Sequence, residues 1–335
     1  MEQIIKLLKS RDTFVIAGHT GPDGDTIGSC LGLALALAKT GKKATVVLEP
    51  IARKYHVIPG REYLHSGDIS GLEADVFIAL DCADKERLSI ALPLFHRANT
   101  TVCIDHHGTN PGFADYNFID PQVSSTAEMV FGIIEAITSL DTDIATAIYC
   151  GIVGDTGGFR YMSTAKSTME IAARLMETGI PFTDLYSEML HRHSFEAGKA
   201  FGLALGAARQ AMGGRVVYTF MTREMLISAG ADSSDMDTVV EYLMNTRGAD
   251  VALFLYERHQ KDEPGDGGAV AQDAPEAMLR KIKVSMRSRG FDVGRIAEAL
   301  GGGGHRMAAG CTMVGTLEGV LAQVLKLFEL ELGAE

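Results

Sequence analysis

The chain has 335 residues, an apolar fraction of 46%, a charged fraction of 22% and a formal net charge of −12. This length predicts two domains, since domains usually run to about 100 to 200 residues. No stretch has the roughly 18 uninterrupted apolar residues that a membrane span needs, and the negative charge argues against whole-surface binding to long duplex nucleic acid. A short polyanion held by metal ions and a local basic patch remains compatible with this balance.

The cysteines lie mostly in apolar stretches of the sequence. They are Cys30, Cys82, Cys103, Cys150 and Cys311. An odd number of cysteines among apolar residues indicates buried free thiols in a reducing compartment. The chain also begins without a basic and apolar leader segment. We therefore expect a cytoplasmic protein.

The first half of the chain predicts strands that alternate with helices. Short apolar stretches predict strands over residues 13–17, 43–48, 75–80 and 101–104. Helical spacing of apolar residues predicts helices over residues 26–38, 124–137, 143–153, 163–179, 181–193 and 195–212. Because strands that alternate with helices form parallel sheets, we expect an α/β fold with a mostly parallel, doubly wound sheet.

The pattern restarts at about residue 215 and predicts a second, smaller α/β domain. A helix and three strands are expected over residues 237–245, 216–221, 251–256 and 281–289. Residues 260–275 are acidic and rich in glycine without apolar periodicity, which predicts a mobile loop. We therefore divide the chain into a first domain over 1–190, a linker helix over 191–212 and a second domain over 213–335.

The turn after the first predicted strand combines one imidazole with two carboxylates. His19, Asp23 and Asp25 lie between that strand and the next helix, at the carboxyl end of a strand, where open α/β sheets bind ligands. Imidazole and carboxylate ligands without thiolate suit manganese or magnesium. A metal-binding turn is one interpretation, and a Pro-Asp-Gly turn in which Asp25 caps the helix is the other.

Two later strands end in polar residues on the same predicted edge. Asp81 follows one strand directly, and Asp105, His106 and His107 follow the next. A lone Asp in this position is usually a turn residue or a helix cap. Adjacent histidines beside several carboxylates instead favour a metal or phosphate site.

A further acidic residue follows the predicted helix over 143–153. Asp155 lies in a Gly-Asp-Thr-Gly sequence, where glycine lets the backbone approach a ligand closely, although a turn-forming Asp has the same pattern. Arg160 comes five residues later. It is a candidate contact for a substrate phosphate, with a surface carboxylate as the alternative partner.

The second half of the chain carries two further motifs. In residues 281–289, apolar residues alternate with Lys281, Lys283, Arg287 and Arg289, so a strand would present a basic row on one face. This row is a candidate polyanion contact or an ordinary solvated face. In residues 301–310, four glycines precede His305 and Arg306. They would offer backbone N–H groups to an anion, and a flexible hinge is the alternative.

With these motifs assembled, the chain resembles the DHH phosphoesterase family, and within it the nanoRNase and 3′-phosphoadenosine 5′-phosphate (pAp) phosphatase branch. The resemblance covers nearly the whole chain and depends on the order of five motifs. They are His19-x₃-Asp23-Gly-Asp25, Asp81, Asp105-His106-His107, Gly154-Asp155-Thr156-Gly157 and Gly302 to His305. One departure is Gly21, which stands where the family often has Asn.

The resemblance implies an active site in the cleft between two domains, with two manganese ions and with magnesium or cobalt as alternatives. The first ion would be bound by His19, Asp23 and Asp81. The second would be bound by Asp25, Asp81, His106 and Asp155. His107 would contact the scissile phosphate or pass a proton to the leaving oxygen, with Asp105 orienting a histidine. The implied nucleotide contacts in the second domain are Arg287, Gly302, Gly303, Gly304 and His305.

The expected function is hydrolysis of very short oligoribonucleotides to mononucleotides, with release of phosphate from pAp as a second activity. Hydrolysis of a cyclic dinucleotide or its linear product is the close alternative. A non-catalytic nucleotide-binding regulator is the alternative from another class, although such a module has little physical reason to retain the complete ligand set. The expected partners are short RNA or small nucleotides rather than a membrane, and a homodimer is left open.

Overall fold

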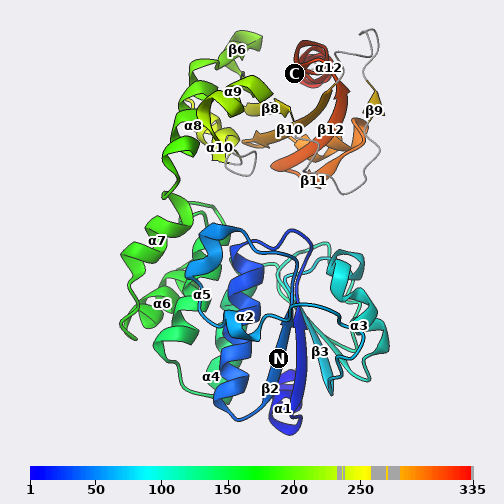
Figure 1. The fold of residues 1–335 in the computed structure, drawn as a ribbon, viewed down its shortest axis with the longest axis vertical. Helices are drawn as coiled ribbons and strands as arrows, with labels where there is room; N and C mark the ends of the chain where they lie inside the picture. The colour runs from blue at the N-terminus through cyan, green and yellow to red at the C-terminus, as the bar shows by residue number, and fades with distance from the viewer. Residues whose placement is uncertain (232–235, 237, 258–268, 271–279, 333–335) are drawn as a thin grey trace. The chain divides into compact units, whose positions relative to one another are not determined.

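The computed structural model describes residues 1–231, 236, 238–257, 269–270 and 280–332. The chain folds into two compact units, residues 1–192 and 193–335 (Figure 1). Each unit is built on its own sheet and has its own apolar core. The expected mixed α/β architecture with a second sheet domain is therefore confirmed.

A five-stranded, wholly parallel sheet forms the centre of the first unit, in the order β2-β1-β3-β4-β5. The strands are β1 (Thr13–Ala17), β2 (Lys43–Val47), β3 (Val76–Leu80), β4 (Thr101–Asp105) and β5 (Tyr116–Ile119). The first four match the predicted strands, because parallel strands covered on both faces are continuous apolar stretches. Strand β5 was not predicted, since it is a four-residue edge strand that is only partly buried.

Helices cover both faces of this sheet (Figure 1). They are α1 (Glu2–Ser10), α2 (Gly24–Lys39), α3 (Leu92–Arg97), α4 (Thr126–Ile137), α5 (Thr142–Asp155), α6 (Lys166–Met176) and α7 (Phe182–Leu190), with 3₁₀ segments η1 (Arg53–Val57), η2 (Arg61–Tyr63) and η3 (Lys85–Ala91). Helices α1, α2, α4 and α5 pack on the face that carries Ile16 and Ile78. Segments η3 and α3 pack on the face that carries Val15 and Phe77. The sheet is therefore doubly wound, as expected.

Helices α2 and α5 approach each other closely because glycines face the contact. A Cβ at Gly28 would lie 2.4 Å from the carbonyl oxygen of Ala147, and one at Gly154 would lie 3.2 Å from the α-carbon of Gly24. Side chains at these positions would push the helices apart. The close contact brings the start of α2 to the end of α5.

The second unit contains a mixed sheet in the order β11-β12-β10-β8-β7-β6, with β9 paired to β12. The strands are β6 (Arg209–Ala211), β7 (Val216–Met221), β8 (Val251–Glu257), β9 (Ala269–Val270), β10 (Arg280–Ser288), β11 (Gly303–His305) and β12 (Ala308–Gly315). The helices are α8 (Phe195–Gly206), α9 (Arg223–Ala229), α10 (Thr238–Met244), α11 (Val293–Ala299) and α12 (Leu317–Leu332), with η4 (Met212–Gly214). Helices α11 and α12 pack on one face and α8 to α10 on the other.

One expectation for this half of the chain needs correction, and another lies mostly outside the described residues. The helix predicted over 195–212 stops at Gly206, and Arg209–Ala211 form strand β6 instead, paired antiparallel with β7 through a turn in which Gly213 and Gly214 have positive φ. The loop predicted over 260–275 lies outside the described residues except for Ala269–Val270, which form strand β9.

All five cysteines are buried free thiols, as predicted from the mostly apolar stretches in which they lie. Among the helices of the described residues, none combines the length and apolar character needed to cross a lipid bilayer.

Candidate metal centre

Three strands of the first unit deliver polar side chains to one edge of the sheet. His19 lies two residues beyond β1, Asp81 follows β3, and His106 follows Asp105 at the end of β4. Because β1, β3 and β4 run parallel, their carboxyl ends meet at this edge. The distances are short: His19 Nε2 lies 3.5 Å from Asp81 Oδ2, and His106 Nε2 lies 3.7 Å from Asp81 Oδ1.

The structure brings the six sequence-derived ligand candidates together in adjoining groups. Within each group, the potential ligand atoms lie within 4.8 Å of one another. One group contains His19, Asp23 and Asp81, and another contains Asp25, His106 and Asp155. Asp81 also forms a group with His106 and His107. Asp81 therefore lies between the other members of the two ligand sets that the family resemblance implies.

Asp81 is buried and held in an unusual conformation. Its φ is +54°, in the left-handed region that non-glycine residues rarely adopt. Thr26 Oγ1 donates to its Oδ2 at 2.6 Å, and Thr126 Oγ1 donates to its Oδ1 at 3.3 Å. These two threonines fix the carboxylate, and sequence reasoning missed both, because a Thr at a helix start looks like an ordinary helix-terminal residue.

Asp23 is both a helix cap and a member of the cluster, through different oxygens. Its Oδ1 accepts from the backbone N–H groups of Asp25 and Thr26 at 3.0 and 3.1 Å, which caps helix α2. Its Oδ2 lies 3.8 Å from His19 Nε2. The alternative interpretation that Asp25 caps this helix is therefore wrong, because the cap is Asp23.

Asp25 lies in the first turn of α2 and is fully buried. Its carboxylate accepts hydrogen bonds from the backbone N–H groups of Thr126 and Ala127, at 2.6 and 2.8 Å, at the start of α4. Burial raises the pKa of Asp25 well above its usual range, and the charge of Asp81 adds to this shift. The hydrogen bond from the backbone N–H of Ala127 on α4 lowers this pKa and so opposes the shift.

Asp155 is the last residue of helix α5, rather than part of a turn as the flanking glycines suggested. Its Oδ2 lies 3.0 Å from His106 Nε2. The chain turns only afterwards, through Gly157, Gly158 and Phe159, which all have positive φ. The turn leads to Arg160, which is exposed.

A hydrogen-bonded pair lies at the end of β4, with Asp105 buried and His107 partly exposed. His107 Nδ1 lies 2.7 Å from Asp105 Oδ1, and Asp105 is 0% exposed. Burial opposes ionisation of Asp105, but hydrogen bonds from His107 and Asn110 outweigh burial and lower its pKa. Because an ionised carboxylate only accepts, Nδ1 of His107 is the protonated nitrogen. Sequence reasoning did not identify Asn110.

The loop that carries His19 is fixed by Glu49, another residue that sequence reasoning missed. The Glu49 carboxylate accepts from the hydroxyls of Thr20 and Ser89 and from the N–H of Gly21, at 2.6 to 3.0 Å. His19 Nδ1 in turn lies 2.8 Å from the carbonyl oxygen of Thr20. If Nδ1 donates this hydrogen bond, Nε2 of the neutral imidazole is unprotonated. Because Nε2 faces the cluster, its lone pair can then coordinate a metal ion.

The charges of the cluster shift two histidine pKa values strongly upward. Burial opposes protonation of His19, but Asp23 and Asp81 outweigh it and raise its pKa to about 10. Burial likewise opposes protonation of His106, and Asp155 is the main group that raises its pKa to about 9. The carboxylates thus stabilise positive charge on the two histidines, and a divalent cation bound in the site would supply positive charge in the same place. The oxygen and nitrogen donors therefore fit divalent metal ions.

The basic row of the second unit has the predicted alternation. Along β10, the side chains of Ile282, Val284 and Met286 are buried, while the basic residues between them are partly exposed. The Arg287 side chain is 31% exposed, and its Nη2 lies 3.6 Å from Glu241 Oε1 on α10. Arg287 is therefore accessible at the surface of this sheet.

The glycine motif is a strand rather than a hinge. Gly303–His305 form β11, paired antiparallel with β12. A Cβ at Gly302 would lie 2.2 Å from the carbonyl oxygen of Gly310, and one at Gly304 would lie 2.6 Å from the α-carbon of Ala309. Glycine is therefore required for this close packing. The side chain of His305 is not among those that the structure describes.

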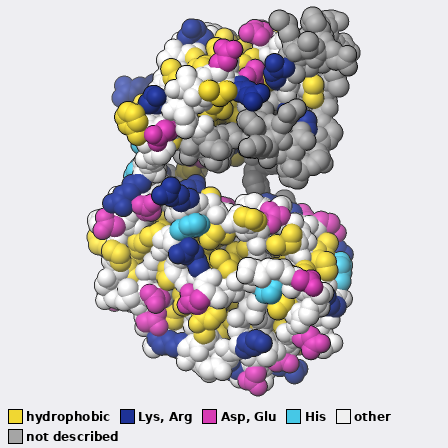
Figure 2. All heavy atoms as spheres, in the orientation of Figure 1, with side chains coloured by type: hydrophobic (Ala, Val, Ile, Leu, Met, Phe, Trp, Pro, Cys, Tyr) yellow, Lys and Arg dark blue, Asp and Glu magenta, His cyan; other side chains and the backbone are white. Residues whose placement is uncertain are grey.

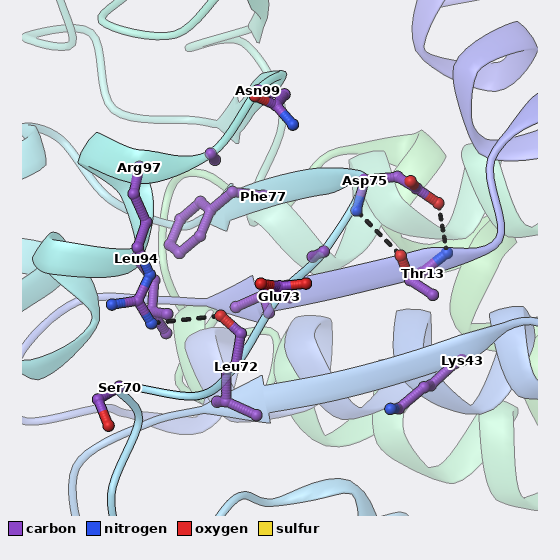
Figure 3. A pocket seen from close by; sticks show the side chains of 13 residues that line it. Thr13, Lys43, Ser70, Leu72, Glu73, Asp75, Phe77, Leu94, Arg97 and Asn99 are labelled. Atoms are coloured by element: carbon purple, nitrogen blue, oxygen red, sulfur yellow. Dashed lines mark hydrogen bonds between the residues drawn. The ribbon is translucent and has the colours of Figure 1, made fainter.

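A cavity of about 660 Å³ opens at the opposite, amino-end edge of the first sheet (Figure 3). Two of its charged groups already have partners within the fold: Arg97 Nη2 donates to the carbonyl oxygens of Ile69 and Leu72, and Asp75 Oδ2 accepts from the N–H of Thr13. Because open α/β sheets bind ligands at the carboxyl edge, the metal centre is the better candidate site.

The surface of the first unit mixes both signs of charge. On the face drawn in Figure 2, acidic and basic side chains of residues 1–192 are interspersed. Long single strands usually bind along a continuous positive groove. On this face of the first unit, the basic side chains do not form such a continuous band.

Matches to known families follow the two halves of the chain. Residues 13–152 match the DHH family, N-terminal domain, and residues 213–334 match the DHHA1 domain. With the ligand cluster at the sheet edge, these matches show that the chain belongs to the DHH family. The resemblance drawn from the sequence motifs is therefore confirmed.

Individual relatives match over nearly the full chain. The bifunctional oligoribonuclease and PAP phosphatase NrnA of Thermus thermophilus is 32% identical over 94% of this chain and 89% of its own. The cyclic-di-AMP phosphodiesterase GdpP of Geobacillus thermodenitrificans is 26% identical over 96% of this chain but 48% of its own. The crystal structure of an exopolyphosphatase-related protein from Bacteroides fragilis, 26% identical, has a TM-score of 0.84 and covers 99% of this chain and 95% of its own.

Proposed function

We propose that this protein is a phosphoesterase that hydrolyses very short oligoribonucleotides to mononucleotides and converts pAp to AMP. The observation that carries the proposal is the cluster of six ligand candidates at one sheet edge. The similarity to the NrnA relative, whose name gives both activities, supports the choice of substrates.

We further propose that the cluster binds two manganese ions, with magnesium or cobalt as substitutes. The proposed ligands of one ion are His19, Asp23 and Asp81. Those of the other are Asp25, Asp81, His106 and Asp155. Mixed imidazole and carboxylate donors favour manganese over magnesium, which prefers oxygen ligands. When bound, such a pair of ions lowers the pKa of a water molecule and neutralises charge on a phosphoryl oxygen.

The protein's own groups would orient the reacting phosphate and supply a proton. Asp105 holds the imidazole of His107 through Nδ1, so His107 contacts the phosphate, or passes a proton to the leaving oxygen, through Nε2. Thr26 and Thr126 hold the carboxylate of Asp81 by hydrogen bonds. Metal ligands and proton donor are thus oriented before substrate binds.

We assign nucleotide binding to the second domain, over 213–335, joined by residues 191–212 to the catalytic domain over 1–190. The proposed contacts in that domain are Arg287, Gly302, Gly303, Gly304 and His305, and Arg160 is a further proposed contact from the catalytic domain. The partly exposed guanidinium of Arg287 supports this assignment, because charge-assisted contacts to phosphate are strong. Groups from both domains would then bind the substrate, and the contacts of the second domain would select its length.

The same reasoning extends to partners and location. We propose short RNA and small nucleotides as partners, rather than long duplexes or membranes, in keeping with the net charge of −12. Five buried free thiols support a reducing compartment such as the cytoplasm.

Hydrolysis of a cyclic dinucleotide is the second candidate, favoured by the similarity to the GdpP relative. The experiment that separates the candidates is incubation of the purified protein and manganese with di- to decaribonucleotides, cyclic dinucleotides, pAp and pyrophosphate. The proposal expects the highest kcat/KM on the shortest oligonucleotides, with measurable release of phosphate from pAp. A preference for cyclic dinucleotides would select the second candidate, and binding without turnover would indicate a regulator.

A further inference from the structure

The buried carboxylate of Asp105 has a different side-chain partner at each oxygen. Oδ1 accepts from His107 Nδ1, and Oδ2 accepts from Asn110 Nδ2, both at 2.7 Å. Since Asp105 is 0% exposed, losing either donor would leave a buried charged oxygen without compensation from bulk water. The two bonds together set the orientation in which the carboxylate faces His107.

Asn110 is itself fixed at both ends of its amide. Its Oδ1 accepts from the N–H of Gly112 at 2.8 Å, which determines which way the amide points. Its Nδ2 therefore faces three acceptors, which are Asp105 Oδ2, the carbonyl oxygen of Cys82 at 3.0 Å and Cys103 Sγ at 3.4 Å. Its backbone N–H donates to the carbonyl oxygen of His107 at 3.1 Å. Asn110 thus connects the chain just beyond β3 with the end of β4 and closes the turn after His107.

We propose that Asn110 is a positioning residue for His107 and acts through Asp105. Asn110 fixes the carboxylate, the carboxylate fixes the proton on Nδ1, and His107 consequently meets substrate through Nε2. The expected effect of Asn110 on turnover rests on the proposed function. Its expected effect on the position of the proton on the His107 imidazole does not. The hydrogen bonds of Asn110 involve Asp105, Cys82, Cys103, Gly112 and His107, none of which is a proposed metal ligand. Asn110 therefore acts on the orientation of His107 rather than on the six proposed metal ligands.

The first test is a double-mutant cycle on a diribonucleotide. Asn110→Ala should lower kcat at least tenfold, with KM and bound manganese per chain within twofold of wild type. If Asn110 acts through Asp105, then Asn110→Ala should cost less than twofold in an Asp105→Ala background. Losses that multiply in the double variant, or a wild-type kcat in the single variant, would overturn the proposal. Asn110→Ser replaces the alanine variant if that protein does not fold.

The matched control is Asn117→Ala, because Asn117 lies on nearby β5 and its amide bonds only to the backbone of Ala114 among its recorded contacts. This variant removes the same type of side chain and a comparable set of backbone bonds. It should retain the wild-type kcat. A loss equal to that of Asn110→Ala would mean that any disturbance of this region slows turnover, and positioning by Asn110 would be rejected.

The second test needs no substrate. In metal-free protein labelled with ¹⁵N-histidine, the side-chain nitrogen shifts report whether Nδ1 or Nε2 of His107 carries the proton, with His107→Gln identifying the signals. Wild type and Asn117→Ala should show the proton on Nδ1, and Asn110→Ala should show a mixture. Unchanged shifts in Asn110→Ala would overturn the proposal. If wild-type protein hydrolyses no phosphoester, the proposed function fails, and this test still decides the positioning role.

Discussion

The carboxylate of Asp25 accepts a hydrogen bond of 2.6 Å from the backbone N–H of Thr126, which lies 101 positions later in the chain. Thr126 begins helix α4, whose N-terminal amides carry a partial positive charge. Helix α4 therefore stabilises a carboxylate whose pKa is raised by burial and by neighbouring carboxylates. This contact orients Asp25 before any metal binds.

Asp81→Ala should abolish turnover on every phosphoester substrate. The carboxylate of Asp81 lies within 3.7 Å of both His19 and His106, so its loss removes the group shared by the two ligand sets. Turnover and bound manganese should be measured together. Asp84→Ala is the control, because Asp84 caps η3 three residues away through the N–H of Arg87. Near-normal rates in Asp81→Ala would show that Asp81 does not bridge the two ions.

Thr26→Val should weaken metal binding by about ten- to a hundredfold, the usual cost of losing a partner of a metal ligand. The substitution preserves shape but removes the hydroxyl that donates to Asp81 Oδ2 at 2.6 Å. Isothermal titration with manganese measures the change. Thr146→Val, at a buried position on α5, is the matched control and should bind as wild type does. Equal affinities in the two variants would contradict the role given to Thr26.

The metal-free protein should lose thermal stability as pH rises from about 6.5 to about 10. In the folded state the pKa of His19 is raised to about 10 and that of His106 to about 9, from 6.5. A raised folded pKa gives stability that is present below the unfolded pKa and lost as pH rises through the folded one. Calorimetry in the presence of a chelator measures this decline.

The control for this pH dependence is a comparison of variants under the same conditions. His19→Gln with His106→Gln should flatten the decline of Tm with pH, whereas His96→Gln, a substitution on α3, should retain it. An equally steep decline in the double variant would assign the pH dependence to other groups.

Sequence patterns could predict the sheet edge and its ligands because both follow from local rules. A buried parallel strand is a short apolar stretch, and the polar residue that follows it must emerge at the carboxyl edge. His19, Asp81 and His106 were found in this way. Helix α12 was not predicted, although its sequence pattern would have allowed it. Val320, Val324 and Phe328 recur at helical spacing and are buried.

The groups that orient the ligands could not be predicted, because their partners are distant in sequence. Thr26 lies 55 positions from Asp81, and Thr126 lies 45 positions from it. Glu49 lies 40 positions from Ser89. Each looks like an ordinary polar surface or helix-terminal residue until the fold brings it to its partner. Local periodicity carries no information about such pairs.

Manganese should support faster turnover than magnesium in protein first stripped of metal. The proposed ligands include the imidazoles of His19 and His106, and nitrogen donors disfavour magnesium relative to manganese. The measurement is kcat/KM on a diribonucleotide with each metal at saturation. Equal rates with the two metals would remove the basis for assigning manganese.

Arg287→Ala should lower kcat/KM on a diribonucleotide by about ten- to a hundredfold, since charge-assisted contacts to phosphate contribute roughly 1.5 to 3 kcal/mol. Arg287 lies on β10 in the second unit, partly exposed, whereas the ligand candidates all lie in the first. Bound manganese per chain should therefore not change. A nitrophenyl phosphodiester, which lacks a second nucleotide, should be hydrolysed at close to the wild-type rate.

Arg209→Ala is the matched control, because Arg209 is an exposed arginine on β6, an edge strand of the same sheet. It should leave kcat/KM unchanged on both substrates. Both substrates contain the reacting phosphoester, but only the diribonucleotide has a second nucleotide. A loss of kcat/KM on the diribonucleotide alone is therefore expected only if Arg287 contacts that nucleotide. An equal loss on both substrates, or a loss of manganese, would show that Arg287 supports the catalytic centre or the fold. The division of labour between the two domains would then have to be abandoned.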